Sequence, residues 1–270
     1  MTDNPGFVTQ IDGRQATADD LSPLAFAGFA HFTAMQIRDG RVRALDLHLA
    51  RLRSASLEFF DRALPDELVR RHLRSAIGSG RPNLSLTATV FSRAGEFSPE
   101  GAADDPAILV RTAPPSDGPT DPLRLAVVAH ERPLPWIKHV GEATKTHFLR
   151  RAVRSGHDDA AFIDAQGNLS EATIWNLAFW DGEAVVWPKA PVLAGVTMAT
   201  IRRQLDGAQI AQREEVVRPD DLGRLQGAAV MNSWTPGIGV EAIGSTTLPA
   251  SPRFLDILHR VYEREPMEPV

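Results

Sequence analysis

The chain has 270 residues, 43% of them hydrophobic and 23% charged, which is typical of a globular protein with one large core or two smaller ones. Its 29 Lys and Arg residues are outnumbered by 34 Asp and Glu residues, and the formal net charge of -5 indicates neither a nucleic-acid nor a membrane partner. Because cysteine is absent, disulfides, thiolate zinc sites, iron–sulfur clusters and cysteine nucleophiles are excluded.

The amino-terminal residues, MTDNPGFVTQIDGRQ, lack the basic start and the apolar run of a signal peptide, and no stretch approaches the roughly 20 apolar residues of a membrane span. These features predict a cytoplasmic protein. The 8 histidines show no spacing typical of a zinc site, so no metal is expected. The short motifs of metalloproteases, serine hydrolases and P-loop proteins are absent as well.

The first 112 residues are predicted to form a small α+β domain. Apolar and polar residues alternate in its strands, and Asp39-Gly40 between two such runs predicts a hairpin turn. Leucines at helical spacing follow directly, with Asp46 as the expected helix cap. The expected elements are strands at 7–13 and 29–44, helices at 45–57 and 66–77, and strands at 84–93 and 107–112.

Residues 113–122, APPSDGPTDP, have the composition of an interdomain linker. We place the domain boundary there, which leaves 123–270 as a larger α+β domain. Its expected elements are a strand at 123–129, a basic helix at about 143–155, strands at 160–164 and 183–188 with a turn at Asp181-Gly182, a helix at 197–205, strands at 228–232 and 238–243, and a helix at 252–264.

Lys138 lies between aromatic and aliphatic neighbours at the end of a Pro-rich turn. Desolvation favours the neutral form of an amine, and a neutral amine attacks an aldehyde to form a Schiff base. The alternative is a lysine whose stem packs on Trp136 while its charge reaches water, and the local sequence alone favours that alternative.

Glu171 follows a strand and a turn at Gly167, and it precedes a polar and then apolar run. A buried carboxylate at this point needs a cationic partner, and a protonated pyridine nitrogen would serve as one. A turn or helix cap at Ser170-Glu171 explains the same residues equally well.

Gly195-Val196-Thr197 precedes a helix-compatible run, so its backbone N–H groups and a hydroxyl would favour a phosphate. Arg51 in the first helical segment, and Asn232 with Ser233 after a strand, could complete the phosphate site. Each of these features is weak alone, because Gly-X-Thr caps and surface arginines are common.

Taken in chain order, these features resemble the class IV pyridoxal-phosphate enzymes, which include branched-chain and D-amino-acid aminotransferases and 4-amino-4-deoxychorismate lyase. The resemblance covers nearly the whole chain. His48-x-x-Arg51-Leu52 resembles the helix whose arginine holds the cofactor phosphate. Gly167-x-x-Ser170-Glu171, followed by Asn176-Leu177, is similar to the family's glutamate motif. Gly195-Val196-Thr197 and Met231-Asn232-Ser233 are similar to its two phosphate-binding turns.

The resemblance also decides between two candidate Schiff-base lysines, Lys138 and Lys145. In the family the lysine precedes the glutamate by a little over thirty residues. Lys138 precedes Glu171 by 171 − 138 = 33 residues, whereas Lys145 precedes it by only 171 − 145 = 26. The spacing therefore favours Lys138.

The chain departs from the family aminotransferases around the expected substrate pocket. They often carry a tyrosine, or a phenylalanine followed by glutamate, where this chain has Phe32-Thr33, and its single tyrosine is Tyr262. Phe32-Thr33 is closer to the lyase pattern. Met198 replaces an arginine, and Trp234 lies where other members have small residues. The expected substrate-binding residues are Phe32, Thr33, Trp234 and, for a substrate carboxylate, Arg93.

The resemblance implies a two-domain α+β fold of type IV, a homodimer, and pyridoxal phosphate held between the domains. Lys138 and Glu171 would be catalytic, and the cofactor would contact Arg51, Lys138, Glu171, Asn176, Val196, Thr197, Asn232 and Ser233. The implied reaction is transamination between a small amino donor and a 2-oxo acid. The alternatives are β-elimination from aminodeoxychorismate with release of pyruvate, and a catalytically degenerate cofactor-binding scaffold.

Overall fold

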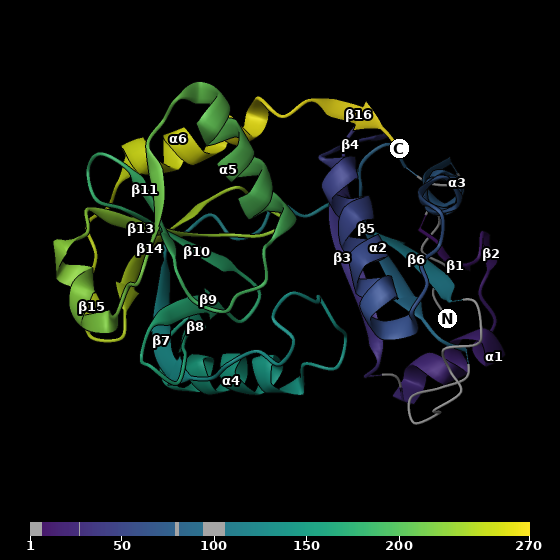
Figure 1. Cartoon of the computed structure of the whole chain (residues 1–270), viewed down its shortest axis with the longest axis horizontal. Coiled ribbons are helices and arrows are strands. Elements are labelled where there is room, and N and C mark those ends of the chain that lie inside the picture. The colour runs from purple at the N-terminus through teal and green to yellow at the C-terminus, as the bar shows by residue number, and fades with distance from the viewer. Residues whose placement is uncertain (1–6, 27, 79–80, 94–105) are drawn as a thin grey trace. The chain divides into compact units, whose positions relative to one another are not determined.

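The computed structural model describes residues 7–26, 28–78, 81–93 and 106–270, and these divide into two compact units (Figure 1). The first unit comprises the described residues up to Ser116 together with Ile137–Glu142 and Pro266–Val270, and the second comprises Asp117–Trp136 and Ala143–Glu265. The division after Ser116 lies inside the expected linker at 113–122. Ile137–Glu142 and Pro266–Val270 belong to the first unit, whereas the expected division placed both segments in the second domain.

The first unit contains a five-stranded antiparallel sheet in the order β2-β1-β6-β5-β3. Apolar residues from one face of the sheet form a common core with α2 and α3, including Met35, Leu49 and Leu73. A short helix, α1 (Ala18–Leu21), precedes β3. The bounds are β1 Thr9–Ile11, β2 Arg14–Gln15, β3 Ala30–Ile37, α2 Leu45–Phe60, α3 Asp66–Gly78, β5 Leu84–Phe91 and β6 Ala107–Ala113.

The predicted turn at Asp39-Gly40 is present, with φ angles of 50° and 70° at its two central residues. Both angles are positive, as a type I′ turn requires, and Arg38 and Arg41 exchange two backbone hydrogen bonds across it. The turn splits the expected strand at 29–44 into β3 and β4 (Arg41–Arg43), and β4 pairs with β16 (Met267–Pro269), which the sequence does not predict.

The sequence predicts Asp46 as the cap of helix α2, and this prediction is wrong. Its N-cap is Ala44, which makes no side-chain cap hydrogen bond, and Asp46 lies within the first turn. The backbone N–H of Leu45 instead donates to Glu268 Oε1 at 3.2 Å. A carboxylate at a helix N-terminus stabilises the helix by accepting such bonds and by opposing the helix dipole.

The second unit is built on a nine-stranded sheet, part of which closes into a ring. Strands follow the order β10-β13-β14-β7-β8-β9, and β9 pairs again with β10 through Glu171 and Asn176. The bounds are β7 Leu123–Ala129, β8 Asp159–Ile163, β9 Leu169–Ala172, β10 Asn176–Trp180, β11 Val185–Pro188, β12 Gln212–Glu215, β13 Gly227–Met231, β14 Ile238–Ile243 and β15 Thr246–Thr247.

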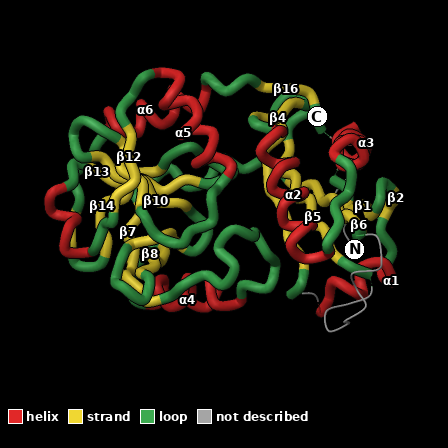
Figure 2. The backbone as a smooth tube through the Cα atoms, in the orientation of Figure 1, coloured by secondary structure: helices red, strands yellow, loops and turns green. Residues whose placement is uncertain are grey.

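Side chains that alternate along the strands fill two cores of the second unit. Leu177, Phe179 and Val230 belong to the core enclosed by the ring, whereas Ala178 and Met231 face the core shared with α5 (Val196–Ala208) and α6 (Pro252–Glu263). A further helix, α4 (Ala143–Arg154), packs against β8 (Figure 2). Among the described residues, no helix combines the length and apolar character that crossing a membrane requires.

Candidate functional site

Glu171 lies on β9 with only 4% of its surface exposed, and two cations contact its carboxylate. Lys145 Nζ, from the first turn of α4, lies 3.1 Å from Glu171 Oε1, and an Arg132 guanidinium nitrogen lies 3.4 Å from the same oxygen. Lys145 and Arg132 are buried too. Because a buried carboxylate is costly unless it is paired, Lys145 and Arg132 offset the cost of burying Glu171.

Asn176 links Glu171 to the start of α5. It faces Glu171 across the β9–β10 pair, and its side-chain amide donates to the Leu193 carbonyl oxygen at 2.7 Å and accepts from the Gly195 N–H at 3.1 Å. A Cβ on Gly195 would lie 2.0 Å from Asn176 Oδ1, so glycine is required here by the close approach of the two residues. Asn176 therefore positions the segment from which α5 begins.

The start of α5 has the features of an anion-binding site. Gly195 is its N-cap and makes no side-chain cap bond, and the N–H groups of Val196, Thr197 and Met198 in the first turn have no acceptor within the helix. The Thr197 hydroxyl donates to the Asn232 carbonyl oxygen at 2.8 Å, which brings the turn at Asn232-Ser233 beside the helix start. Asn232 Oδ1 accepts from the Trp234 N–H at 2.8 Å and orders this turn.

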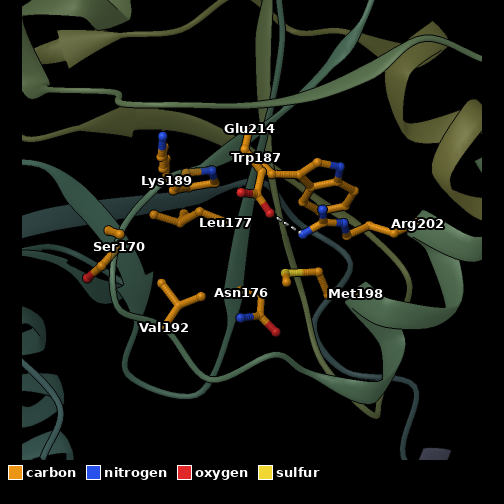
Figure 3. A pocket seen from close by; sticks show the side chains of 11 residues that line it. Ser170, Asn176, Leu177, Trp187, Lys189, Val192, Met198, Arg202 and Glu214 are labelled. Atoms are coloured by element: carbon orange, nitrogen blue, oxygen red, sulfur yellow. Dashed lines mark ion pairs between the residues drawn. The ribbon is translucent and has the colours of Figure 1, made fainter. Parts of the chain in front are cut away.

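A cavity of about 110 Å³ lies next to Asn176 in the second unit (Figure 3). Asn176 and Met198 line one side, and the Arg202–Glu214 ion pair, with an N–O distance of 2.8 Å, lies on the other. Ligand pockets for small molecules usually enclose roughly 300 Å³ or more. The cavity alone is therefore too small to define a cofactor site.

Lys138 belongs to the segment of the first unit that pairs with β3. Its carbonyl oxygen accepts from the Phe32 N–H at 2.9 Å, and the Val140 N–H donates to the Ala30 carbonyl oxygen at 2.7 Å. The Lys138 ammonium lies 4.8 Å from the centre of the Phe32 ring. The segment thus fixes the backbone of Lys138 and sets its amine beside an aromatic face.

Two expected substrate-binding residues of the first unit have other partners. Thr33 is fully buried on the helix-covered face of β3, and its hydroxyl lies 2.6 Å from His48 Nδ1 of α2. This placement favours a role in packing, whereas Phe32 points to the opposite face of the strand. Arg93, just beyond β5, forms an ion pair with Asp12. Its guanidinium is already engaged by a carboxylate within the same unit.

Arg51 is half-buried on α2, one turn after His48. The structure thus distributes the predicted residues over both units. The second unit brings together Glu171, Asn176, Val196, Thr197, Asn232 and Ser233, and the first unit holds Arg51 and Lys138. Arg132 and Lys145 are the partners of Glu171 that sequence reasoning did not assign. Their only sequence signal is that both are basic residues shortly before the glutamate motif.

Buried histidines of the first unit predict that its stability depends on pH. Burial lowers the pKa of His31 to about 3, and burial with the nearby Arg51 charge lowers the pKa of His48 to about 3, from the ordinary value of 6.5. In the unfolded chain these two histidines therefore bind protons near pH 6.5, whereas in the folded chain they bind them only near pH 3. We expect the free energy of unfolding to keep the whole contribution of these histidines above pH 6.5. Between pH 6.5 and pH 3 it should fall by about 1.4 kcal/mol per pH unit for each histidine.

Urea unfolding between pH 7 and pH 4 measures this dependence. His48→Gln should reduce the slope by about 1.4 kcal/mol per pH unit, because it removes one of the two histidines whose pKa burial lowers to about 3. His147→Gln serves as the control, because His147 is exposed on α4 and should leave the slope as it is in the wild type. An unchanged slope in His48→Gln would contradict the assignment.

A model of the family described as Amino-transferase class IV matches residues 30–243. The chain therefore belongs to the class IV aminotransferase family, as the resemblance of its motifs indicated. A search of curated proteins finds no match. The match to the family includes both the β3 segment and the Glu171 motif.

Solved structures share the fold at low sequence identity. A branched-chain aminotransferase from Thermoproteus uzoniensis, solved with norvaline, aligns with a TM-score of 0.80 and 19% identity over 96% of this chain and 94% of its own. A putative 4-amino-4-deoxychorismate lyase from Legionella pneumophila aligns with a TM-score of 0.80 and 17% identity over 93% and 95%. An aminotransferase from Brucella abortus, solved with the cofactor PLP, aligns with a TM-score of 0.80 and 17% identity over 96% and 98%. The predicted two-domain α+β fold of type IV is confirmed.

Proposed function

We propose that the protein binds pyridoxal phosphate and transfers an amino group between a small amino donor and a 2-oxo acid. One observation carries the proposal. In the second unit, Asn176 joins a buried carboxylate, Glu171, to an open helix start at Gly195. A carboxylate and an anion-binding helix start are the two groups that a pyridine ring with a phosphate arm needs.

The residues present fit this cofactor. Val196, Thr197, Asn232 and Ser233 would hold the phosphate, with Arg51 as a further cation, and Glu171 would accept a hydrogen bond from the ring nitrogen. Fixing both ends of the ring orients it before a substrate arrives. The bound cofactor supplies an electron sink for the substrate carbon.

Lys138 is the proposed covalent attachment point for the cofactor. Its backbone is fixed by β3, and its amine lies beside the Phe32 ring. With the cofactor bound, the Lys138 amine would also serve as the acid–base group that moves a proton at the substrate carbon. The family resemblance also implies a homodimer, which analytical ultracentrifugation of the purified protein would test.

The second candidate reaction is β-elimination with release of pyruvate. It is favoured by the sequence Phe32-Thr33, which stands where the family aminotransferases often carry a phenylalanine followed by glutamate. Phe32-Thr33 is closer to the lyase pattern. A putative lyase is also among the proteins that share this fold. A lyase would release pyruvate without any amino acceptor.

The test begins with the visible absorbance of the purified protein mixed with pyridoxal phosphate, before and after borohydride. A band that borohydride abolishes, with the label mapped by mass spectrometry to Lys138, would support cofactor attachment. A screen of amines with 2-oxo acids, assayed for new amino acids and for pyruvate, would then separate transaminase from lyase. Absence of any band would overturn the proposal in favour of a degenerate scaffold.

A further inference from the structure

The sheet of the first unit has two different faces. Met35 of β3 and Val110 of β6 point into the core shared with α2 and α3. Side chains alternate along each strand, so the residues next to them point away from these helices. At one end of this second face, Ile11 and Leu109 belong to a separate apolar cluster. The remainder, which we call the open face, carries half-exposed or exposed side chains, namely Phe32, Ala34, Thr87, Thr89, Arg111 and Thr9.

Arg111 lies in the middle of the open face. It is paired with Thr87 of β5 on one side and with Thr9 of β1 on the other. Residues directly opposite each other on neighbouring antiparallel strands have Cβ atoms roughly 4.5–5.5 Å apart, so both threonine side chains are direct neighbours of the arginine side chain. Ala34 of β3 continues the same row beyond Thr87, and its small side chain leaves space there. Adjacent strands therefore present one guanidinium flanked by two hydroxyls.

The side chain of Arg111 has no anionic partner among the described residues. Arg14, Arg53 and Arg93 of the same unit each form an ion pair with a carboxylate. Within the described part of the chain, no ion pair or side-chain hydrogen bond involves Arg111, and none involves the hydroxyls of its two threonine neighbours. A guanidinium offers several donors and no acceptor, and its planar fork matches the two oxygens of a carboxylate. The open face thus has the donors that a carboxylate ligand needs.

We propose that Arg111, with the hydroxyls of Thr87 and Thr9, binds the carboxylate of the substrate. Arg93, the residue expected for this role, is paired with Asp12 instead. The inference rests on the proposed function and names the substrate class, which is amino acids and 2-oxo acids as opposed to amines that lack a carboxylate. Phe32 lies on the same face, one row along the strands from Arg111, where its ring would contact the apolar part of the same molecule.

The first test measures binding in the absence of the cofactor, with two probes of similar size of which only one is charged. Pentanoate and pentanamide are titrated by NMR into the wild type, Arg111→Met and Arg111→Lys. Arg111→Met should raise the Kd for pentanoate by about ten-fold, as expected for lost charge-assisted hydrogen bonds, and should change the Kd for pentanamide by less than about two-fold. Arg111→Lys should give an intermediate Kd for pentanoate, because it keeps the charge but not the planar fork.

Arg71→Met is the matched control for these titrations. Arg71 is also exposed in the first unit, but it belongs to α3, which covers the opposite face of the sheet. Its replacement should leave both Kd values unchanged. An equal rise in the Kd for pentanoate in Arg71→Met and Arg111→Met would overturn the inference, since it would reflect the net charge of the unit and not a site.

The second test measures selectivity with pyridoxal phosphate bound. It compares 2-aminopentanoate with butylamine, which lacks only the carboxylate. Arg111→Met should lower kcat/KM for the amino acid by about ten-fold or more and leave kcat/KM for the amine as it is in the wild type. A similar loss for both substrates, or an unchanged Kd for pentanoate in Arg111→Met, would overturn the inference while transamination itself stands. A wild type that forms no borohydride-sensitive band would instead refute the proposed function, and binding of pentanoate through Arg111 would be unaffected.

Discussion

Replacing Lys138 with alanine is expected to abolish the borohydride-sensitive band of the protein with pyridoxal phosphate and to lower the rate of the catalysed reaction by about 1,000-fold or more. The physical reason is that one amine both attaches the cofactor and carries the proton, and the loss of a positioned acid–base group alone costs roughly 100- to 10,000-fold. Absorbance and single-turnover kinetics of the purified variant measure both effects.

Lys145→Ala is the control for this prediction. Lys145 is the other lysine shortly before the Glu171 motif, and its ammonium is engaged by that carboxylate. The Lys145 variant should keep the band while binding the cofactor more weakly. If the band instead survives in Lys138→Ala and disappears in Lys145→Ala, the covalent role belongs to Lys145, and the spacing argument for Lys138 is wrong.

The second large effect is expected from Gly195→Ala. The new methyl group would lie 2.0 Å from Asn176 Oδ1, and Asn176 cannot move aside without giving up its bonds to Leu193 and Gly195. Forcing extra atoms into packed structure costs about 1–3 kcal/mol. We expect a loss of unfolding free energy in this range together with weaker binding of pyridoxal phosphate, measured by urea unfolding and by titration.

Two further variants test whether the contact with Asn176 causes the effect of Gly195→Ala. Gly207→Ala adds a methyl group to the same helix where nothing lies within 4 Å, so it should leave stability and affinity near those of the wild type. Asn176→Ala in the Gly195→Ala background removes the clashing oxygen, so the two substitutions should be less harmful together than the sum of their separate effects. Strictly additive losses would show that the contact between these side chains is not responsible.

Local chemistry explains which parts of the fold were predictable from the sequence. The turn at Asp39-Gly40 depends only on two residues that accept positive φ, and it was predicted correctly. The pairing of β4 with β16 was not predicted, because it joins segments from opposite ends of the chain and neither segment carries a signal for the other. Strand β10 was missed because it is buried on both faces and lacks the alternation of a half-exposed strand.

The candidate site shows the same limit. Glu171 and Gly195 could be proposed from motif spacing and from the resemblance to a family, since each motif is contiguous in the sequence. The pairing of Glu171 with Lys145 depends on how α4 packs against the sheet, which no local pattern specifies. For Thr33, the position in the motif suggested contact with the substrate. The alternation of side chains along β3 instead turns its hydroxyl toward His48.

The bond from Leu45 to Glu268 has a consequence for how the chain folds during synthesis. It spans 223 positions, and the strand that carries Glu268 also supplies the partner of β4. Domains usually fold in the order in which they leave the ribosome. Here the unit that is translated first lacks a helix cap and a strand until residues 266–270 emerge, so it is completed only after the second unit has been translated in full. A nascent chain halted before that point would carry a frayed α2 and an unpaired strand edge exposed to chaperones.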